Sequence, residues 1–309
     1  MYHCPPLRPM PTAPPSDQLL FVGVPNGASA VDFPSAFGTA SRALDVVSPG
    51  VYEGLRTFER GHFFGLRTHL TRLRESAALF KTTLHYDEEH LVRALESAAR
   101  QATDAFDAEA RLRLDVAAGS AAAFGGESNV LIAASAYRGM RAEVRSHGAR
   151  LLTAPGLRRP DPAVKTSDFI PLREAWINAH GDPEAYEHIM LSEDRMVLEG
   201  TQSNVVLVRD GEVYHAPSGV LPGVTVRAVI DLARADGITI QERFVPVDDL
   251  SSFDEAFMTT SVRSVVPIQS IDDVHFGAPG PVTLRLSTLY DELTASDAVA
   301  PSARELARY

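Results

Sequence analysis

Residues 154–165 read APGLRRPDPAVK, a stretch whose three prolines separate two halves of the chain. Prolines restrict the backbone and interrupt regular structure, which is typical of a linker. Strands, two helices and more strands are predicted before it, and short strands mixed with helices after it. This order favours an α+β fold over alternating βαβ units. We expect a flexible proline-rich arm at 1–18, a small α/β domain at 19–152, a linker at 153–164 and a larger domain at 165–309.

The spacing of apolar residues predicts the individual elements. Within 67–81, Leu70, Leu73 and Ala77 recur at steps of three and four, which indicates an amphipathic helix. Further helices are predicted over 87–102, 169–180, 226–237 and 283–295. A hairpin with Gly61 near its turn is predicted over 51–66, and strands over 19–24, 111–119, 129–137, 187–191, 196–200, 204–210, 212–216, 238–245, 255–261 and 265–271.

The composition narrows the class of protein. The formal net charge of −11 disfavours nucleic acid and an anionic membrane surface as partners. No apolar run reaches the length of a membrane span, and the N-terminal residues do not resemble a signal peptide. Cys4 is the only cysteine, so no intrachain disulfide can form and a reducing cytoplasm is the simpler expectation. Histidines and cysteine show no metal-ligand spacing, so no metal site is predicted.

Lysine is rare in this chain, with two lysines against 27 arginines. Arginine can replace lysine on a solvated surface, but its guanidinium stays protonated and is not a usable amine nucleophile. Lys81 closes a predicted helix, where a cation suits the C-terminus. Lys165 follows the linker with no comparable structural reason. It is therefore a candidate nucleophile, and a surface residue without chemical use is the plainer interpretation.

Four other signals point to a bound anion and a ring nitrogen. LPGVT at 221–225 opens onto a helix that begins near Thr225, and unpaired N–H groups at a helix start attract phosphate. An ordinary helix start capped by threonine is the alternative. The hydroxyl-rich turn at 258–264 offers Ser261, and Arg72 could supply a permanent cation. Glu199 ends a strand and could keep a pyridine nitrogen protonated.

Taken in order, these residues resemble the class IV aminotransferases, the fold type IV pyridoxal-phosphate enzymes. The resemblance covers roughly residues 19–290, and 34 residues separate Lys165 from Glu199. It rests on YEGLRTF at 52–58, HLTRL at 69–73, Lys165, LEGTQSN at 198–204, LPGVT at 221–225 and FMTTSVRSVVPI at 257–268. It implies a small α/β domain before a distorted β-barrel-like α+β domain, a site between the two, and a homodimer.

The resemblance also implies residue roles. Lys165 would link to the cofactor aldehyde and move the substrate Cα proton, and Glu199 would pair with the pyridinium nitrogen. The remaining cofactor-binding residues implied are Arg72, Ser203, Asn204, Leu221, Val224, Thr225 and Ser261, of which Arg72, Val224, Thr225 and Ser261 would hold the phosphate. The substrate-binding residues implied are Tyr52, Arg56, Arg113 and Val262. Arg111 is a further candidate contact for a substrate carboxylate, and like Arg56 and Arg113 it could equally be a surface or interface arginine.

The motifs favour one substrate class and leave others open. EGLR resembles branched-chain aminotransferases, and Arg113 falls where those enzymes place an arginine. The chain departs from them after Lys165, where TSDFI replaces an Asn-Tyr pair, so the tyrosine that would contact the cofactor's phenolic oxygen is absent. We expect transfer between a hydrophobic L-amino acid and a 2-oxo acid such as 2-oxoglutarate. A D-amino-acid or amine transaminase, an aminodeoxychorismate lyase and a cofactor-free binding protein are the alternatives. Ala118 before Gly119 disfavours D-specificity, and Gly54 disfavours the lyase.

Overall fold

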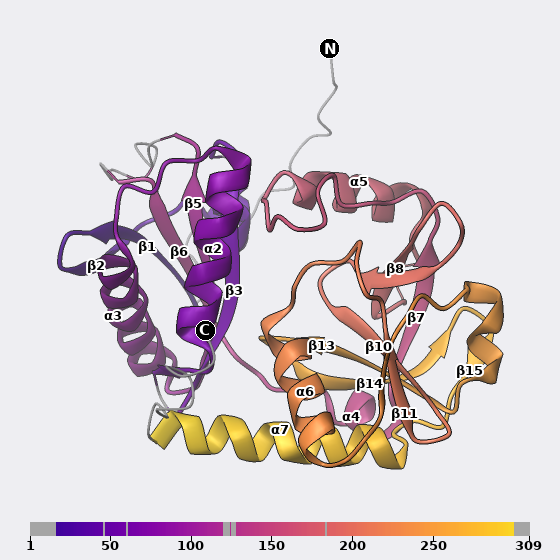
Figure 1. The fold of residues 1–309 in the computed structure, drawn as a ribbon. Coiled ribbons are helices and arrows are strands. Elements are labelled where there is room, and N and C mark those ends of the chain that lie inside the picture. The colour runs from indigo at the N-terminus through magenta and orange to yellow at the C-terminus, as the bar shows by residue number, and fades with distance from the viewer. Residues whose placement is uncertain are drawn as a thin grey trace.

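The computed structural model describes residues 17–299, apart from 46, 60, 120–123, 125–127 and 183. All but two residues of the predicted N-terminal arm therefore lie outside the described chain. The remainder forms two bodies that lie side by side, each built on its own sheet (Figure 1). None of the described helices is both long and apolar enough to cross a membrane.

The first body is a six-stranded antiparallel sheet in the order β2-β1-β6-β5-β3-β4. Its strands are β1 (Gln18–Val24), β2 (Gly27–Val31), β3 (Gly50–Phe58), β4 (His62–Phe63), β5 (Ala110–Ala117) and β6 (Val130–Ala136). Its helices are η1 (Ser35–Phe37), α1 (Ala40–Leu44), α2 (Leu66–Phe80) and α3 (Glu88–Phe106). The helices α2 and α3 cover one face of the sheet, and α1 packs against the other.

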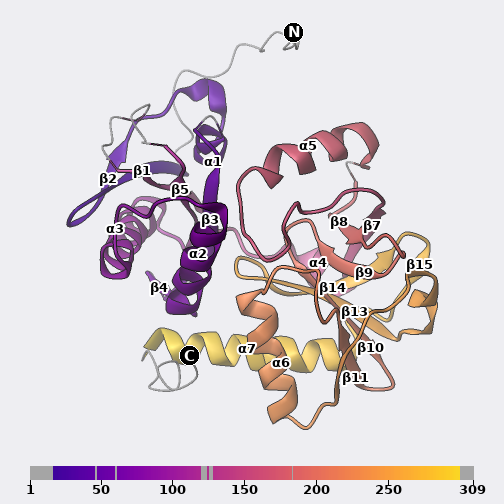
Figure 2. The same cartoon turned by 45° about the horizontal axis from the view of Figure 1, so that its top comes forward.

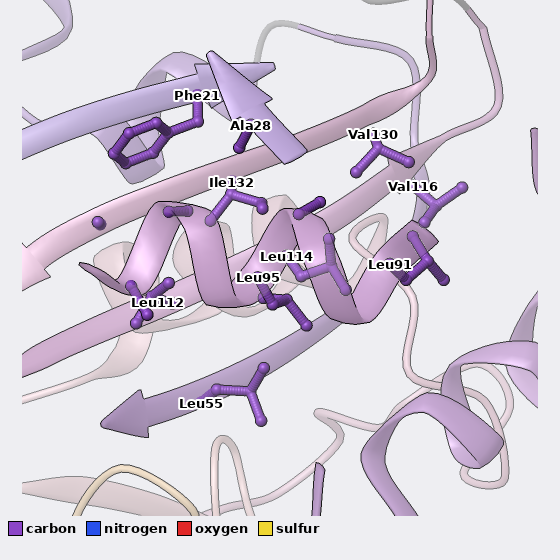
Figure 3. Packing of buried hydrophobic residues seen from close by; sticks show 14 of the residues in the cluster. Phe21, Ala28, Leu55, Leu91, Leu95, Leu112, Leu114, Val116, Val130 and Ile132 are labelled. Atoms are coloured by element: carbon purple, nitrogen blue, oxygen red, sulfur yellow. The ribbon is translucent and has the colours of Figure 1, made fainter. Parts of the chain in front are cut away.

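The amphipathic pattern explains why α3 lies where it does. Asp87 caps its start by accepting the His90 N–H at 2.9 Å, which satisfies one of the unpaired donors there. Leu91 and Leu95 then pack against Leu114 and Val116 of β5 in one fully buried cluster (Figure 3). Burying a leucine side chain contributes about 1.5–3 kcal/mol, so this stripe fixes the helix on the sheet.

The second body is a nine-stranded sheet that closes on itself. Its main order is β12-β11-β10-β13-β14-β7-β8-β9, and β10 also pairs with β9 through Asn204 and Glu199, which completes a barrel. The strands are β7 (Ala149–Ala154), β8 (Glu187–Leu191), β9 (Val197–Gly200), β10 (Asn204–Arg209), β11 (Glu212–His215), β12 (Ile240–Glu242), β13 (Glu255–Thr260), β14 (Ser264–Ile271) and β15 (Val274–His275). The helices are α4 (Ala142–His147), α5 (Phe169–His180), α6 (Val224–Ala235), η3 (Val247–Ser252) and α7 (Pro281–Val299).

The helix α7 joins the two bodies. It runs along one end of both in the two views (Figures 1 and 2) and packs with α6 against the outside of the barrel. The ring of Tyr290 on α7 meets Phe64 of the first body edge to face, with centroids 5.4 Å apart. This aromatic contact helps to hold the two sheets at a fixed separation, and the space between them contains the site described below.

The predicted fold is confirmed, and the long helices and most strands lie where the pattern places them. The structure divides the chain earlier than the predicted ranges, because α4 and β7 belong to the barrel. The predicted linker at 153–164 therefore begins inside β7. The sequence did not predict β2, α1, α4, β7 or β15. Each has six residues or fewer, too few for an apolar period to show.

Candidate active site

A cavity of about 290 Å³ opens between the two bodies. The first body contributes residues of β3, β5 and α2 to its wall, and the barrel contributes the rest. The lining residues are Tyr52, Gly54, Arg72, Arg111, Arg159, Lys165, Glu199, Gln202, Ser203, Asn204, Leu221, Gly223, Val224, Thr225, Thr259, Thr260, Ser261, Val262 and Arg263. A concave site with a few convergent polar groups is the usual form of a small-molecule site.

Lys165 lies in the segment between β7 and α5, which runs alongside β3 of the first body. Its backbone N–H donates to Ser76 Oγ at 3.1 Å, and its carbonyl accepts the Tyr52 N–H at 3.0 Å. The side-chain amine lies 4.8 Å from the centre of the Tyr52 ring. Burial lowers the pKa of Lys165, and the nearby Arg72 and Arg159 cations lower it further, against the opposing effect of Tyr52. The amine is thus more often neutral, the form that acts as a nucleophile.

Tyr52 lies in the same electropositive region. Burial tends to raise the pKa of its phenol, but the positive charges of Lys165 and Arg159, with Arg173 and Arg113 behind them, bring it below the ordinary value. The cavity wall around the lysine therefore favours negative charge.

Glu199 lies at the seam where the barrel closes. Its carboxylate accepts the Leu221 N–H at 3.0 Å and lies 3.3 Å from Arg159 Nε. The amide of Asn204 donates to the Leu221 carbonyl at 2.9 Å and contacts Glu199 at 3.4 Å. Burial raises the pKa of Glu199, and Arg159 and the Leu221 N–H partly offset that rise. A cationic ring nitrogen at this carboxylate would further favour its charged form.

The start of α6 offers the groups that bind phosphate. Its N-cap is Gly223, no described side chain caps it, and Gly223, Val224 and Thr225 line the cavity, so its first N–H groups are available to an anion there. The threonine-cap alternative is wrong, because Thr225 lies inside the helix. The hydroxyls of Thr225 and Ser261 are 3.4 Å apart, and Arg72 Nη1 donates to the Pro222 carbonyl at 2.9 Å. This donor set suits a dianion held by a helix start, two hydroxyls and a guanidinium.

A buried charge network holds Arg72 in that place. Glu53 accepts Arg72 Nε at 2.8 Å and Nη2 at 2.5 Å, and His69 Nδ1 lies 2.8 Å from the same carboxylate. Burial alone would raise the pKa of Glu53, but Arg72 and His69 lower it to about 2. The arginine is thereby fixed with its remaining donor turned toward α6.

The structure brings most of the predicted residues together. Those that line this one cavity are Tyr52, Arg72, Lys165, Glu199, Ser203, Asn204, Leu221, Val224, Thr225, Ser261 and Val262. Among them, Ser203 already donates its hydroxyl hydrogen to Glu187, at 2.8 Å. A pyridoxal-phosphate molecule needs an amine, a carboxylate and a phosphate cradle, and this group of residues supplies all three. The buried Thr259 hydroxyl, which has no partner among the described residues, adds an unused polar group to the wall.

Two predicted substrate residues do not line the cavity. Arg113 is paired with Asp115, at 2.7 and 2.8 Å, and with Asp45 at 2.9 Å. Arg56 donates to Ser264 at 3.1 Å and lies over the Phe58 ring. Their charges are therefore engaged within the protein, and the structure does not bring these two residues into the cavity with the others.

The residues predicted for the site did not include Glu53 and Ser76, which hold Arg72 and Lys165 in place, or Arg159, which lines the cavity. The first two had a usable signal. Ser76 follows Arg72 by four residues on the same flank of α2, and Glu53 lies inside the YEGLRTF motif. Arg159 had none, since nothing in the sequence separates it from the other 26 arginines.

Gly223 is expected to tolerate no side chain. A methyl group there would overlap Asn204 Oδ1 and approach Val226, and the Asn204 amide is fixed by its bond to Leu221. Overpacking costs about 1–3 kcal/mol, so Gly223→Ala should weaken cofactor binding by about 10-fold or more. Equilibrium titration of the apo protein with pyridoxal phosphate measures this. Gly277→Ala is the control, because the nearest atom to a methyl group there is 3.5 Å away. An unchanged dissociation constant for Gly223→Ala would contradict the packing at the start of α6.

Comparison with known proteins agrees with this site. Residues 50–271 match the family described as amino-transferase class IV. A probable branched-chain-amino-acid aminotransferase of Thermotoga maritima is 31% identical over 243 residues, which cover 76% of this chain and 83% of that protein. A D-alanine aminotransferase of Bacillus licheniformis is 29% identical, over 77% of this chain and 85% of that protein.

Solved structures show the same fold. The crystal structure of a putative branched-chain amino acid aminotransferase from Thermotoga maritima superposes with a TM-score of 0.71 at 26% identity, over 91% of this chain and 98% of that one. The T.th. branched-chain amino acid aminotransferase with pyridoxamine 5'-phosphate gives a TM-score of 0.70 at 26% identity, over 91% of this chain and 95% of that one. The chain therefore belongs to the class IV aminotransferase family and is a pyridoxal-phosphate-dependent transaminase.

Proposed function

We propose that this transaminase moves an amino group between a hydrophobic, branched-chain L-amino acid and a 2-oxo acid, with 2-oxoglutarate as acceptor, in two alternating half-reactions. The observation that carries the chemistry is Lys165, an amine of lowered pKa in a cavity shared with Glu199 and the uncapped start of α6. The substrate class is supported by the similarity to aminotransferases named for branched-chain amino acids.

The residues of this chain divide the work. When bound, pyridoxal phosphate supplies an aldehyde that links to amines and a ring that accepts an electron pair. Lys165 would hold the cofactor and would take the proton from the substrate Cα. Glu199 would keep the ring nitrogen protonated. Arg72, Thr225, Ser261 and the N–H groups of α6 would bind the phosphate and so orient the ring.

The closed barrel makes this arrangement rigid. Glu199 and Asn204 face each other across the β9–β10 pair, so the carboxylate is anchored by two strands. Lys165 is anchored by backbone hydrogen bonds to the first body. A proton transfer between positions held on different elements needs this fixed geometry, because small misplacements cost large factors in rate.

The assignment is tested by following the cofactor absorbance of the holoenzyme after addition of single amino donors. We expect rapid conversion with L-leucine, L-valine and L-isoleucine, and recovery with 2-oxoglutarate. Conversion only by D-alanine would support the second candidate, a D-amino-acid transaminase, which the match to a D-alanine aminotransferase favours. Pyruvate release from aminodeoxychorismate would indicate the lyase. Protein that stays colourless with pyridoxal phosphate would contradict every one of these activities.

We also propose that the enzyme is a homodimer of the cytoplasm. The single cysteine supports the compartment, and the family resemblance, which implies a homodimer, supports the assembly. The net charge of −11 favours neither nucleic acid nor an anionic lipid surface as a partner. Sedimentation of the holoenzyme at twice the mass of one chain is the expected result, and a monomer at micromolar concentration would contradict the assembly.

A further inference from the structure

Three buried polar side chains lie along one face of α2. His69, Arg72 and Ser76 are spaced by three and four residues, which places them on the same side of the helix. All three are buried, and a buried polar group is costly unless it is hydrogen-bonded. His69 and Arg72 share the Glu53 carboxylate. Ser76 has a different partner, the main chain of Lys165.

The contact between Ser76 and Lys165 joins α2 to the segment between β7 and α5. The Lys165 N–H donates to Ser76 Oγ at 3.1 Å, although 89 residues separate the two in the chain. The Lys165 carbonyl accepts the Tyr52 N–H at 3.0 Å. Both polar groups of the lysine main chain are therefore bonded to the first body. The bond to Ser76 uses a side chain, so a substitution at position 76 removes it without changing a backbone group.

The other bonds of this segment show what Ser76 adds. The Ser167 N–H donates to the Gly50 carbonyl at 2.9 Å, and the Gly50 N–H donates to Ser167 Oγ at 2.9 Å. Together with the bond from Tyr52, these contacts attach the segment to β3. They do not involve Ser76, whose hydroxyl ties the same segment to α2. Loss of that hydroxyl should therefore shift Lys165 locally rather than detach the segment.

The helix α2 also carries Arg72, one turn before Ser76. Four residues of α-helix rise about 6 Å, a spacing that the helix keeps fixed. Arg72 Nη1 donates to the Pro222 carbonyl beside the start of α6, and Glu53 holds its other donors. One helical turn therefore separates the arginine of the phosphate cradle from the serine that holds the lysine main chain. Because Arg72 has its own support, Ser76 can act on the amine without acting on the cradle.

We propose that Ser76 is a positioning residue, which fixes the Lys165 main chain against α2 and so places the amine at the aldehyde end of the cofactor site. This inference rests on the proposed transaminase function and adds a residue that controls the placement of its nucleophile. Burial and the Arg72 and Arg159 cations lower the pKa of Lys165, so the reactivity of the amine depends on where the side chain lies. A misplacement of about 1 Å is enough to cost a large factor in rate.

The first test measures the amine directly, in the full-length protein without cofactor. Cyanate labels both lysines over a range of pH, and mass spectrometry compares Lys165 with Lys81. The pH midpoint of Lys165 labelling should rise in Ser76→Ala, because the released amine regains solvent and its pKa moves toward the ordinary value. Ser76→Thr keeps the hydroxyl and should keep the wild-type midpoint.

Ser128→Ala is the matched control. Ser128 is also buried in the first body, and its Oγ also accepts a backbone N–H, that of Val130 at 3.2 Å. Both alanine variants should lose a similar amount of stability in urea unfolding, but Ser128→Ala should keep the Lys165 midpoint. A wild-type midpoint in Ser76→Ala, or an equal rise in both variants, would overturn the proposal.

A binding test separates this inference from the function on which it rests. The dissociation constants of pyridoxal, which lacks the phosphate, and of pyridoxal phosphate are measured by absorbance titration of the same apo proteins. Ser76→Ala should raise both by about 10-fold, the loss of one oriented contact, because both compounds need the amine. A loss confined to pyridoxal phosphate would mean that Ser76 acts through Arg72, and that result, like no loss for either compound, would sink the proposal. Wild-type protein that binds neither compound would contradict the proposed function, while the labelling midpoint would still decide the role of Ser76.

Discussion

Lys165→Ala is expected to abolish transamination, with a loss of at least about 10⁴-fold in both half-reactions. The substitution removes the covalent attachment of the cofactor and the group that moves the Cα proton, and proton transfer by a positioned side chain alone is worth about 10²–10⁴-fold. The other lysine cannot replace it, because Lys81 is exposed at the C-terminal end of α2, away from the cavity lining. Single-turnover absorbance traces measure both half-reactions.

Lys81→Ala is the matched control for this variant. It also removes one amine and one charge, but from a residue outside the cavity, so both half-reactions should keep their wild-type rates. Borohydride reduction of wild-type holoenzyme followed by peptide mapping gives an independent check. The cofactor should be found on the peptide that contains Lys165. A label on Lys81, or on no peptide, would contradict the assignment, as would normal turnover by Lys165→Ala.

The order of motifs in the sequence predicted the residues for the cofactor better than it predicted the other residues that line the cavity. Lys165, Glu199 and the start of α6 come together because each lies at the end of an element or just outside one, where the barrel seam meets the segment between β7 and α5. Such positions are visible as short motifs. The identity of the family then supplied their spatial relation, which periodicity alone does not contain.

The sequence could not predict which arginine of β5 is paired with carboxylates. Strand alternation places Arg111, Arg113 and Asp115 on one face of β5, which the sequence allows one to count. It does not tell which cation is neutralised. That depends on Asp45, which comes from the end of α1 and completes the pairing of Arg113. The resemblance therefore indicated Arg113, which is paired with two aspartates, rather than Arg111, which has no ion-pair partner among the described residues.

The barrel strand β7 is an element of the fold that the local sequence could not predict. ARLLTA at 149–154 has buried and half-buried residues, but it adjoins the proline-rich stretch that was interpreted as a linker. Its partners are β8 and β14, both in parallel pairing, which cannot be inferred from local turns. Long-range parallel pairing leaves little local trace, so the boundary between the bodies was predicted too late in the chain.

Glu53→Gln is expected to destabilise the protein by about 3–5 kcal/mol at neutral pH, the cost of leaving one partner of a buried ion pair without its counter-charge. Glu53 is fully buried, and its carboxylate carries the contacts to both Arg72 and His69. The neutral amide keeps the shape and removes the charge. Urea unfolding at pH 7 measures the change. Glu89→Gln, on a side chain that is 64% exposed, is the control and should shift stability by less than about 0.5 kcal/mol.

The pH dependence of the unfolding free energy tests the role of Glu53 independently. The pKa of Glu53 is about 2 in the folded protein and 4.5 in its reference state, so the unfolded chain binds the proton first as the pH falls. The stabilisation from Glu53, about 3 kcal/mol for such a shift, is therefore complete above pH 4.5 and is lost as the pH falls through 4.5 toward 2. The difference in unfolding free energy between wild type and Glu53→Gln should shrink over the same interval. A constant difference would mean that the carboxylate is not charged inside the protein.

The same variant links stability to cofactor binding. Arg72 is aimed at the Pro222 carbonyl and the start of α6 only while Glu53 holds its other donors. Without that hold, the arginine loses its fixed orientation toward the phosphate cradle, and the dissociation constant of pyridoxal phosphate should rise by about 10-fold, the loss of roughly one oriented contact. Glu89→Gln should leave it unchanged. If Glu53→Gln unfolds more easily but binds the cofactor as tightly as wild type, Glu53 stabilises the fold without orienting Arg72, and the two roles separate.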